Sequence, residues 1–522
     1  MSIINPTRRQ LLGGLAATGL AATGLGVGLA TSLPRPAMAS EPKNGGHLRL
    51  GLSRGSTTDS LDPASYANSF SDTLGFTING NLTEIDEHGR AIPDLAEKWD
   101  VSKDAKRWVF TIRKGVEFHN GKTLSPADVV ASINHHRGEK STSAVKPFAD
   151  TIEAIAIDGD NVVFTLNEGN ADFPYIIGEY HFAIMPATDG KIDWQSGISS
   201  GGYKINEFKP GNRVELTRHA NYWKPGRAHF ADISMLVIHD QMTRMNALLA
   251  NEIDVMESLD PNTVPLLHGN SSLKVEVVKG GLHGTLPMRA DTAPFSDVNI
   301  RLALKYAIDR EDLIKRLRPG MGTIADDHPI APSYRYYAAS LAPRTYDLDK
   351  AKFHLKKAGL STLKLDLNIS DEAFQGAVDL AQIYREQAAK AGIDITVVRE
   401  PAEGYWDNVW MKKPWCGSYW GSRPTEDMIL SSAYQSDAPW NESFWKNERF
   451  DMLLRSARPE LDEGKRAEIY AEAQQLLRDE GSVIIPMFSD FVFATTDKIA
   501  HGELAHNADL DGRRLGERWW FA

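Results

Sequence analysis

The sequence predicts an α/β fold that is divided among several domains. The chain has 522 residues, more than one hydrophobic core usually organises. Apolar residues make up 42% of it and charged residues 24%, which is ordinary for a globular protein. Segments with the alternation of strands and segments with the period of amphipathic helices follow one another in more than one block of the chain. Two to four mixed α/β domains are therefore expected.

The first 39 residues are interpreted as an export signal that is not part of the fold. Residues 7–12 read T-R-R-Q-L-L, a twin-arginine pattern, and residues 11–30 follow without a charge. Residues 37–39, A-M-A, form a site for a signal peptidase. The alternative is a permanent anchor, because about twenty apolar residues can span a bilayer. The glycine content and the cleavage site favour removal after Ala39, and the mature protein is expected in a bacterial periplasm.

Composition excludes several classes of function. The formal net charge of −11 leaves no basic face for nucleic acid, so no nucleic-acid partner is expected. The single cysteine, Cys416, excludes an internal disulfide and a thiolate metal cluster. His135 and His136 are adjacent and would point in different directions on a helix, so no metal site is predicted. No cofactor motif is present, and no cofactor is expected.

Strands and turns dominate the first third of the mature chain. Residues 47–52 alternate as a first strand and are followed by a turn-rich connection at 55–63. Residues 107–112 alternate as a half-exposed strand. Ser125 as N-cap, Pro126 at the first helical position and Asp128 three residues after the cap predict the start of a helix.

Helix signals recur in the second half of the chain. Either Ser296 or Asp297 can cap a helix with an apolar face. Asp347 caps another helix, which Gly359 ends. A last amphipathic helix is predicted over residues 465–480. Each of these helices has one face to bury, so each is expected to cover a core.

One segment predicts a βαβ unit. Residues 363–369 alternate as a strand, a long helix follows to Lys390, and residues 393–398 return as a strand. Such a unit implies two parallel strands joined by a right-handed crossover. Another strand begins at residues 483–486.

Three motifs follow one another in the first part of the mature chain. Residues 93–99 read P-D-L-A-E-K-W, residues 108–122 read W-V-F-T-I-R-K-G-V-E-F-H-N-G-K, and residues 125–133 read S-P-A-D-V-V-A-S-I. In this order they resemble the signature of family 5 extracellular solute-binding proteins, the dipeptide- and oligopeptide-binding receptors of ABC importers. The resemblance extends over residues 45–495. Further matches to the family lie at 201–204, 215–223, 251–255, 294–310 and 346–352.

The resemblance implies a two-lobed periplasmic binding protein, a Venus-flytrap fold, with an extra α/β domain and lobes interleaved in sequence. Such a protein is no enzyme: it closes on a short peptide or another charged, amino-acid-derived solute and presents it to ABC permease subunits. A monomer is expected. The implied parts are the signal 1–39, lobe I at 40–85, 190–285 and 487–522, the extra domain at 86–189, and lobe II at 286–486.

The candidate site lies in an aromatic stretch, residues 405–445, which holds six of the twelve tryptophans. In peptide-binding members a W-x-x-D-Y-P-D-P segment supplies an aspartate for the ligand's ammonium group. The run W-G-S-R-P-T-E-D that begins at Trp420 departs from it, with Ser422 or Arg423 where the aspartate would fall. Arg423 offers a fork for a carboxylate or phosphate. Asp427, or the glutamate before it, can instead take an ammonium or form a salt bridge with Arg423.

Further candidates surround this run. Arg289 is a second cation in a segment that the family places near the cleft, and Trp406, Trp440 and Asn441 are candidates for stacking and hydrogen bonding. For the aromatic candidates, core packing is the alternative. Gly55 belongs to a strand-end loop that is expected to line the cleft.

Two other functions remain open from the sequence. Residues 51–55, G-L-S-R-G, formally match the nucleophile elbow of hydrolases, so an exported serine hydrolase using Ser53 is one alternative. An elbow needs a helix directly after it, whereas a turn-rich segment follows here. The second alternative is a sensory binding protein that docks on a receptor instead of a permease.

Overall fold

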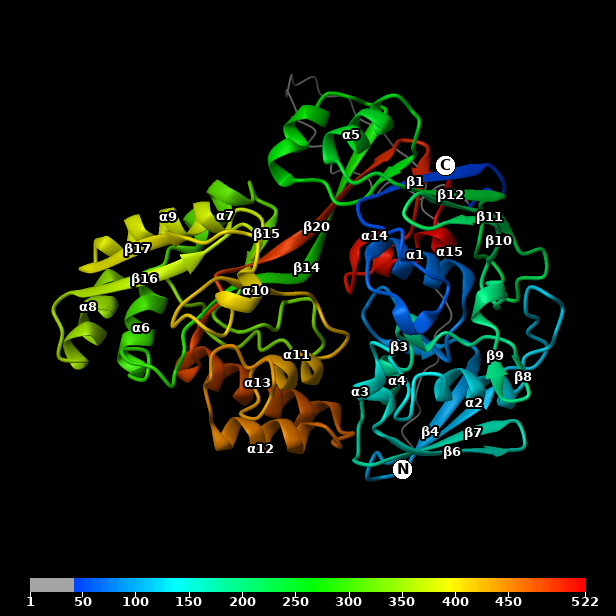
Figure 1. Ribbon diagram of the computed structural model, residues 1–522, viewed down its shortest axis with the longest axis horizontal. Coiled ribbons are helices and arrows are strands. Elements are labelled where there is room, and N and C mark those ends of the chain that lie inside the picture. The colour runs from blue at the N-terminus through cyan, green and yellow to red at the C-terminus, as the bar shows by residue number, and fades with distance from the viewer. Residues whose placement is uncertain (1–41) are drawn as a thin grey trace, which may run out of the picture. The chain divides into compact units, whose positions relative to one another are not determined.

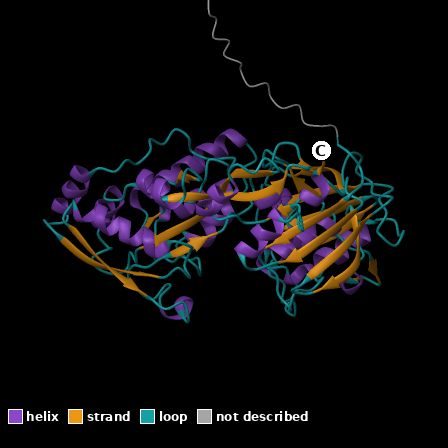
Figure 2. Ribbon diagram, turned by 90° about the horizontal axis from the view of Figure 1, so that it is seen from above, coloured by secondary structure: helices purple, strands orange, loops and turns teal. Residues whose placement is uncertain are grey.

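The structure is a computed structural model that describes residues 42–522 (Figure 1). The export signal predicted at 1–39 lies outside the described residues. Helices and strands alternate through the described chain, as the view from above also shows (Figure 2). The predicted α/β class is confirmed.

The largest sheet in the described chain has ten strands, in the order β10-β11-β12-β1-β13-β20-β14-β18, with β15 added to β20 and β19 to β14. β1 is parallel to β12 and to β13, and the other pairs are antiparallel. The first of these strands is the one predicted from the alternation at 47–52. The strands are β1 (His47–Leu52), β10 (Tyr203–Lys209), β11 (Arg213–Arg218), β12 (Asp232–Val237), β13 (Val255–Met256), β14 (Leu273–Pro287), β15 (Gly322–Ile324), β18 (Ser418–Trp420), β19 (Val483–Ile484) and β20 (Met487–Thr496).

Two long strands of this sheet, β14 and β20, join its parts. Figure 1 shows them running from the group of elements around β16 and β17 to the group around α1 and β1. Their register shifts between Val278 and Leu282. A Cβ atom on Gly280 would lie 2.6 Å from the backbone oxygen of Ser489, so only glycine fits there without a shift of the backbone.

A separate four-stranded antiparallel sheet has the order β4-β5-β7-β6. Its strand β5 buries alternate residues, as predicted for 107–112. Helix α2 contacts β6 and β7 and begins where predicted, because Ser125 and Asp128 form a capping box. The elements are β4 (Ala96–Val101), β5 (Arg107–Ile112), β6 (Ile152–Asp158), β7 (Asn161–Leu166) and α2 (Pro126–Asn134).

The predicted βαβ unit is present. Strands β16 (Leu363–Ile369) and β17 (Ile393–Arg399) are parallel over seven residue pairs, and α9 (Ala377–Ala389) connects them. Asp297 caps α6 (Val298–Tyr306), and Asp347 caps α8 (Leu348–Lys357). Both caps were predicted, because an aspartate side chain can accept from the free amides of a first helical turn.

The remaining elements are shorter or lie between these sheets. The predicted last long helix is α13 (Glu463–Glu480), which begins two residues earlier than predicted. The others are α1 (Ser69–Ile78), α3 (Lys146–Ala149), α4 (Phe173–Ile176), α5 (Gln241–Leu249), α7 (Arg310–Leu317), α10 (Tyr405–Asn408), α11 (Glu426–Ala433), α12 (Glu448–Ala457), α14 (Asp509–Gly512), α15 (Leu515–Arg518), β2 (Thr83–Ile85), β3 (Ala91–Pro93), β8 (Ala187–Thr188), β9 (Lys191–Ile192), β21 (Ile499–Ala500) and β22 (Trp520–Phe521).

Apolar side chains form several distinct cores. One joins distant parts of the chain, because Leu50, Tyr203 and Trp519 are all buried in it. A second fills the space around the four-stranded sheet, with Phe110 and Phe164 in edge-to-face contact. Two more are built within residues 286–488. The domain boundaries given above stay a prediction.

Candidate ligand-binding cavity

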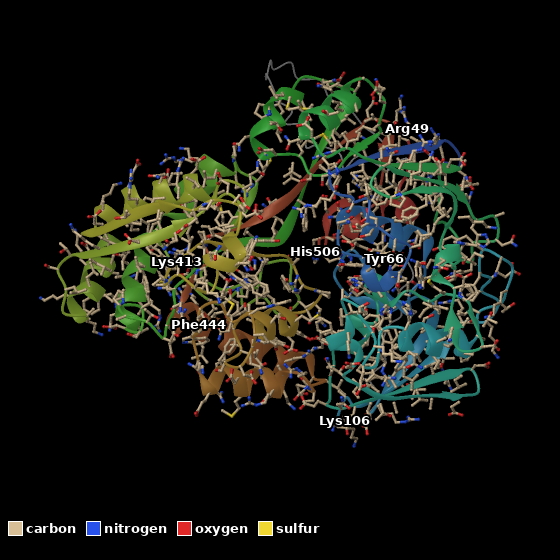
Figure 3. All side chains as sticks on the ribbon, in the orientation of Figure 1. Arg49, Tyr66, Lys106, Lys413, Phe444 and His506 are labelled. Atoms are coloured by element: carbon tan, nitrogen blue, oxygen red, sulfur yellow. The ribbon has the colours of Figure 1, made fainter. Side chains whose placement is uncertain are left out.

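A cavity of about 720 Å³ opens among loops and helix ends of the described chain. Its size is within the range of small-ligand sites, about 300–1,000 Å³. The lining comes from the loop after β1, the first turns of α1, residues 175–182, the loop after β18 and the loop before α14. Leu282 of β14 and Phe491 of β20 also line it. His506, labelled in Figure 3, is a lining residue from the C-terminal part of the chain.

Glu257 is a buried carboxylate of the lining whose partners are all within the protein. It accepts hydrogen bonds from the amide and hydroxyl of Ser53, at 2.6 and 2.8 Å, and from the hydroxyl of Ser69 at 3.0 Å. Arg513 forms an ion pair with it. Burial raises the pKa of Glu257, but Arg513 and these hydrogen bonds outweigh burial and hold the pKa below its usual value. The Ser53 hydroxyl is thus one of the hydrogen-bond donors that stabilise the charged form of Glu257.

This geometry does not favour the hydrolase alternative. A nucleophilic serine needs a base that can take its proton. The hydroxyl of Ser53 donates to Glu257, which is a weak base because Arg513 and its hydrogen bonds hold its pKa low. The imidazole of His239 contacts the backbone oxygen of Ser53, at 3.2 Å, and not its hydroxyl. The chain after β1 continues into a turn rather than into a helix, so the elbow geometry is lacking.

The same side of the cavity carries more acid. Asp72 on α1 and Glu179 both line the cavity. Glu179 accepts from the amide of His181 at 3.0 Å and contacts its ring at 2.7 Å. Burial lowers the pKa of His181, but the charge of Glu179 and its hydrogen bond outweigh burial and raise it above the usual value. Glu179 and His181 therefore balance each other.

The opposite side is formed by the loop after β18, the predicted W-G-S-R-P-T-E-D run. Strand β18 pairs with β14, which places Trp420 opposite His283. Residues 421–424 then line the cavity. The amide of Arg423 donates to the hydroxyl of Tyr334 at 2.9 Å, which fixes the loop. The guanidinium of Arg423 is left half-buried beside the cavity.

The expected alternative, a salt bridge from Arg423 to the acids that follow it, is not formed. Glu426 accepts from the amide of Tyr336 at 2.8 Å and faces Arg335. Asp427 is bound by Arg458 at 2.9 Å. Within residues 42–522 no carboxylate makes an ion pair with Arg423, so its guanidinium remains available to a ligand.

Arg335, another cation of the lining, is held by a buried carboxylate. Asp172, just before α4, pairs with Arg335 at 2.6 Å and with Arg466 of α13 at 2.7 Å. The guanidinium of Arg335 also lies 3.8 Å from the ring centre of Tyr175. Burial raises the pKa of Asp172, but the two arginines outweigh burial and hold it below its usual value. Arg335 is thus a structural cation at the edge of the cavity.

The aromatic stretch is divided between core and surface. Trp415 and Trp445 are buried, and Trp420 is 6% exposed and donates from its indole to Glu442 at 3.1 Å. Trp440 is exposed. It lines the cavity and is 53% exposed, which leaves its face free to stack. Arg423 and Trp440 are therefore the two predicted candidates that the structure places in the cavity lining.

The other candidates lie outside the cavity lining, and their contacts are internal. Arg289 pairs with Asp291 at 2.8 Å and lies over the ring of Phe444, which Figure 3 labels. The remaining three are also engaged. Asn441 donates to the backbone oxygen of Trp445, the Trp406 indole donates to Glu372, and Gly55 faces Val237.

Several lining residues were missed in the sequence. Asp72, Tyr180 and Arg513 come from segments far apart in the chain, and each stands in an ordinary helix or loop pattern. Only the turn-rich segment before α1 hinted at a lining loop. The fold brings these residues into one cavity, and a local sequence pattern cannot indicate which distant segments come together.

The described residues were also considered for metal sites and for membrane-spanning helices, with the following result. Across residues 42–522, no cluster of three or more histidine, cysteine, aspartate or glutamate side chains could hold a metal ion. The same residues contain no helix with the length and apolar character needed to cross a bilayer.

Several α/β cores joined by two long strands, with a charged cavity beside those strands, match the architecture of a two-lobed binding protein. The chain belongs to the bacterial extracellular solute-binding proteins, family 5: the family model "family 5 Middle" matches residues 90–442. The family resemblance seen in the motifs is thus confirmed.

Curated relatives cover most of the chain at low identity. The dipeptide-binding protein of Escherichia coli K12 is 27% identical over 434 residues, which are 76% of this chain and 80% of the relative. Heme-binding protein A of Haemophilus influenzae is 27% identical over 426 residues, 74% of this chain and 77% of the relative. One relative is named for dipeptides and the other for heme, so identity at this level does not identify the ligand of this chain.

Solved structures confirm the two-lobed binding-protein fold. The periplasmic binding protein DppA of Helicobacter pylori, solved with the peptide STSA, has a TM-score of 0.72 and 22% identity, and the match covers 92% of this chain and 99% of that one. The substrate-binding protein CtaP of Listeria monocytogenes has a TM-score of 0.80 and 21% identity, with 92% and 100% covered.

Proposed function

We propose that the protein is the periplasmic substrate-binding component of an ABC importer, and that it captures a short peptide or another charged, amino-acid-derived solute. Family membership supports the binding role, and relatives named for dipeptides and di/tripeptides support the ligand class. The observation that carries the proposal is the cavity of about 720 Å³ with the unpaired guanidinium of Arg423 in its lining. The protein binds and releases its solute unchanged.

Arg423 and Trp440 are proposed as direct ligand contacts. A guanidinium binds a carboxylate or phosphate through two parallel hydrogen bonds, and these strengthen when water is excluded. The exposed indole of Trp440 offers an apolar face for a side chain of the solute. The indole of Trp420 donates to Glu442 and so fixes the start of the loop after β18. Roles in binding for Asp427, Arg289, Gly55, Trp406 and Asn441 stay predictions.

Lobe closure would bury the solute. The proposed halves are residues 40–285 with 487–522 on one side, which includes the extra domain at 86–189, and residues 286–486 on the other. β14 and β20 cross between them and would serve as the hinge, because their register shift at Val278–Leu282 leaves few bonds to rearrange. Export through the twin-arginine pathway, cleavage near Ala39 and a monomeric state belong to the same proposal.

A ligand screen on the mature protein tests the proposal. Peptides, N-substituted amino acids, sugars and inorganic anions are added at millimolar concentration, and the melting temperature is recorded. A bound ligand at about 100 times its dissociation constant stabilises the folded state by roughly 2.7 kcal/mol, a measurable shift. We expect shifts from peptide-like compounds. A shift from neutral sugars alone would refute the ligand class, and a normal uptake rate in a deletion strain would refute the import role.

A further inference from the structure

Asp72 is the open carboxylate of the cavity. It lies in α1, is partly exposed to the cavity, and accepts a single long hydrogen bond, 3.4 Å from the hydroxyl of Ser71. No described cation forms an ion pair with it. The neighbouring lining acids are engaged: Glu257 by Arg513 and two serines, and Glu179 by His181. Asp509, another acid of the lining, accepts from the amide of Leu510 at 2.8 Å. Asp72 makes only the long contact with Ser71 and keeps acceptor capacity for a ligand.

Arg423, which has no carboxylate partner among the described residues, and Asp72, which forms no ion pair there, thus line one cavity. Burial raises the pKa of the Tyr180 phenol, the charges of Glu179 and Asp72 raise it further, and the charge of Arg423 lowers it. The hydroxyl of Tyr180 has no hydrogen-bond partner among the described residues. Asp72, Tyr180 and Arg423 therefore line the same cavity with polar groups that a ligand can bind.

We propose that Asp72 binds a protonated amine of the solute while Arg423 binds its carboxylate or phosphate. The solute then lies with its ammonium end toward α1 and its acidic end toward the loop after β18. This inference rests on the proposed function and narrows the ligand to compounds that carry both charges. It also reverses the direction implied by the family's W-x-x-D pattern, in which the loop after β18 supplies the acid for the ammonium.

The surroundings of Asp72 suit such a role. Burial raises its pKa to about 7, so at neutral pH the free carboxylate is held near half ionisation. The charged groups that face it are Arg513, which lowers the pKa, Glu179, which raises it, and His181, which lowers it. Arg513 and His181 act on Asp72 without forming an ion pair with it, so an incoming ammonium would supply a counter-charge in direct contact.

Calorimetric titration of three proteins tests the inference: the wild type, Asp72→Asn, and the control Asp379→Asn. Asp379 is exposed in the first turn of α9, so the control makes the same change of charge far from the cavity lining. The probes are Ala-Phe, Lys-Ala, Ala-Glu, tri-alanine and glutathione, each also in N-acetylated and C-terminally amidated form.

We expect N-acetylation to weaken binding to the wild type at least tenfold. Asp72→Asn should weaken the free peptide at least tenfold and change the affinity of the acetylated form less than twofold, whereas the control changes neither. If acetylated and free peptides bind equally well, or if Asp72→Asn stays within twofold of wild type, the inference is wrong and the proposed function stands. If no probe with both charges binds, both are wrong.

Discussion

No carboxylate in the described part of the chain pairs with the guanidinium of Arg423, because those that follow it are bound elsewhere. Glu426 accepts from a backbone amide and faces Arg335, and Asp427 pairs with Arg458. A charged group that is half-buried without a counter-ion reduces stability, and such groups are commonly kept for binding. We therefore propose that Arg423 is kept for binding a ligand rather than for the fold.

Replacing Arg423 by alanine should weaken the best ligand at least tenfold, about 1.4 kcal/mol, because the acidic end of the solute loses its bidentate partner. Lysine at the same position should recover only part of the affinity, since an ammonium cannot form the fork. Isothermal titration measures both. Arg385→Ala, on the exposed face of α9, is the matched control. An unchanged affinity of Arg423→Ala would remove this residue from the site.

Asp72 should reduce stability above neutral pH. Its folded pKa, about 7, is above the ordinary 3.8, so the folded state binds this proton more tightly than the unfolded chain does. Stability from this group is full below about pH 4 and is lost as the pH rises through 7. Asp72→Asn should therefore raise the melting temperature at pH 8, by roughly 1–3 °C, and leave it unchanged at pH 4.

Thermal unfolding across pH measures this difference. Asp509, whose burial also raises its pKa to about 7, is present in both proteins and cancels in the comparison. A melting temperature of Asp72→Asn that is lower than wild type at pH 8 would contradict the prediction.

At the scale of elements, one buried carboxylate ties three segments together. Asp172 precedes α4, and its two arginine partners come from α13 and from the loop at residues 333–335. Removing it leaves the buried guanidinium of Arg466 without its counter-ion and leaves Arg335 with only Glu426, at 3.6 Å. A break of that kind in a buried ion network costs far more than the loss of a surface pair.

Asp172→Ala should destabilise the protein by about 3–5 kcal/mol, measured by chemical denaturation at pH 7. Asp160→Ala is the control, because Asp160 is 58% exposed and its pair with Lys114 should contribute less than about 1 kcal/mol. The pKa of Asp172 is held below its usual 3.8, so its contribution is present above that pH and is lost as the pH falls through the folded pKa. Equal effects of the two substitutions would contradict this account.

Elements whose signals are local could be predicted from the sequence. The capping box at Ser125, the caps Asp297 and Asp347, and the βαβ unit at 363–398 all stand where expected, because a cap or a period is decided within a few residues. The site could be predicted only in part. Arg423 followed from a motif, whereas Asp72 lines the same cavity from a segment hundreds of residues away in the chain. Half of the tryptophans in the aromatic stretch are core, since composition does not say which aromatic rings are buried.

At the scale of the molecule, the crossing strands β14 and β20 are the proposed hinge for closure. Gly280 has no room for a side chain, since an added Cβ would lie 2.6 Å from the backbone of Ser489. Any larger residue there must push the two strands apart just where the register shifts. The proposed hinge is thus sensitive to a single methyl group.

Gly280→Ala should reduce the compaction that follows ligand binding. Small-angle X-ray scattering should show a smaller radius of gyration for the wild type with saturating ligand than without it, and a smaller change for the variant, because the strands are held apart. Gly502→Ala is the control, since a Cβ there meets no atom within 4 Å. Full compaction of Gly280→Ala would place the bending point elsewhere.

The cavity lining has a consequence for solute length. Leu282 and Phe491, which belong to this lining, lie in the two crossing strands themselves. If the lobes close as proposed, a solute that is too long would rest on these side chains and hold the lobes apart, and one that is too short would leave them without contact. The pocket would then translate the distance between the two charges of a solute into the angle at which the lobes come to rest, and we expect only the correct angle to give a membrane partner a matching surface.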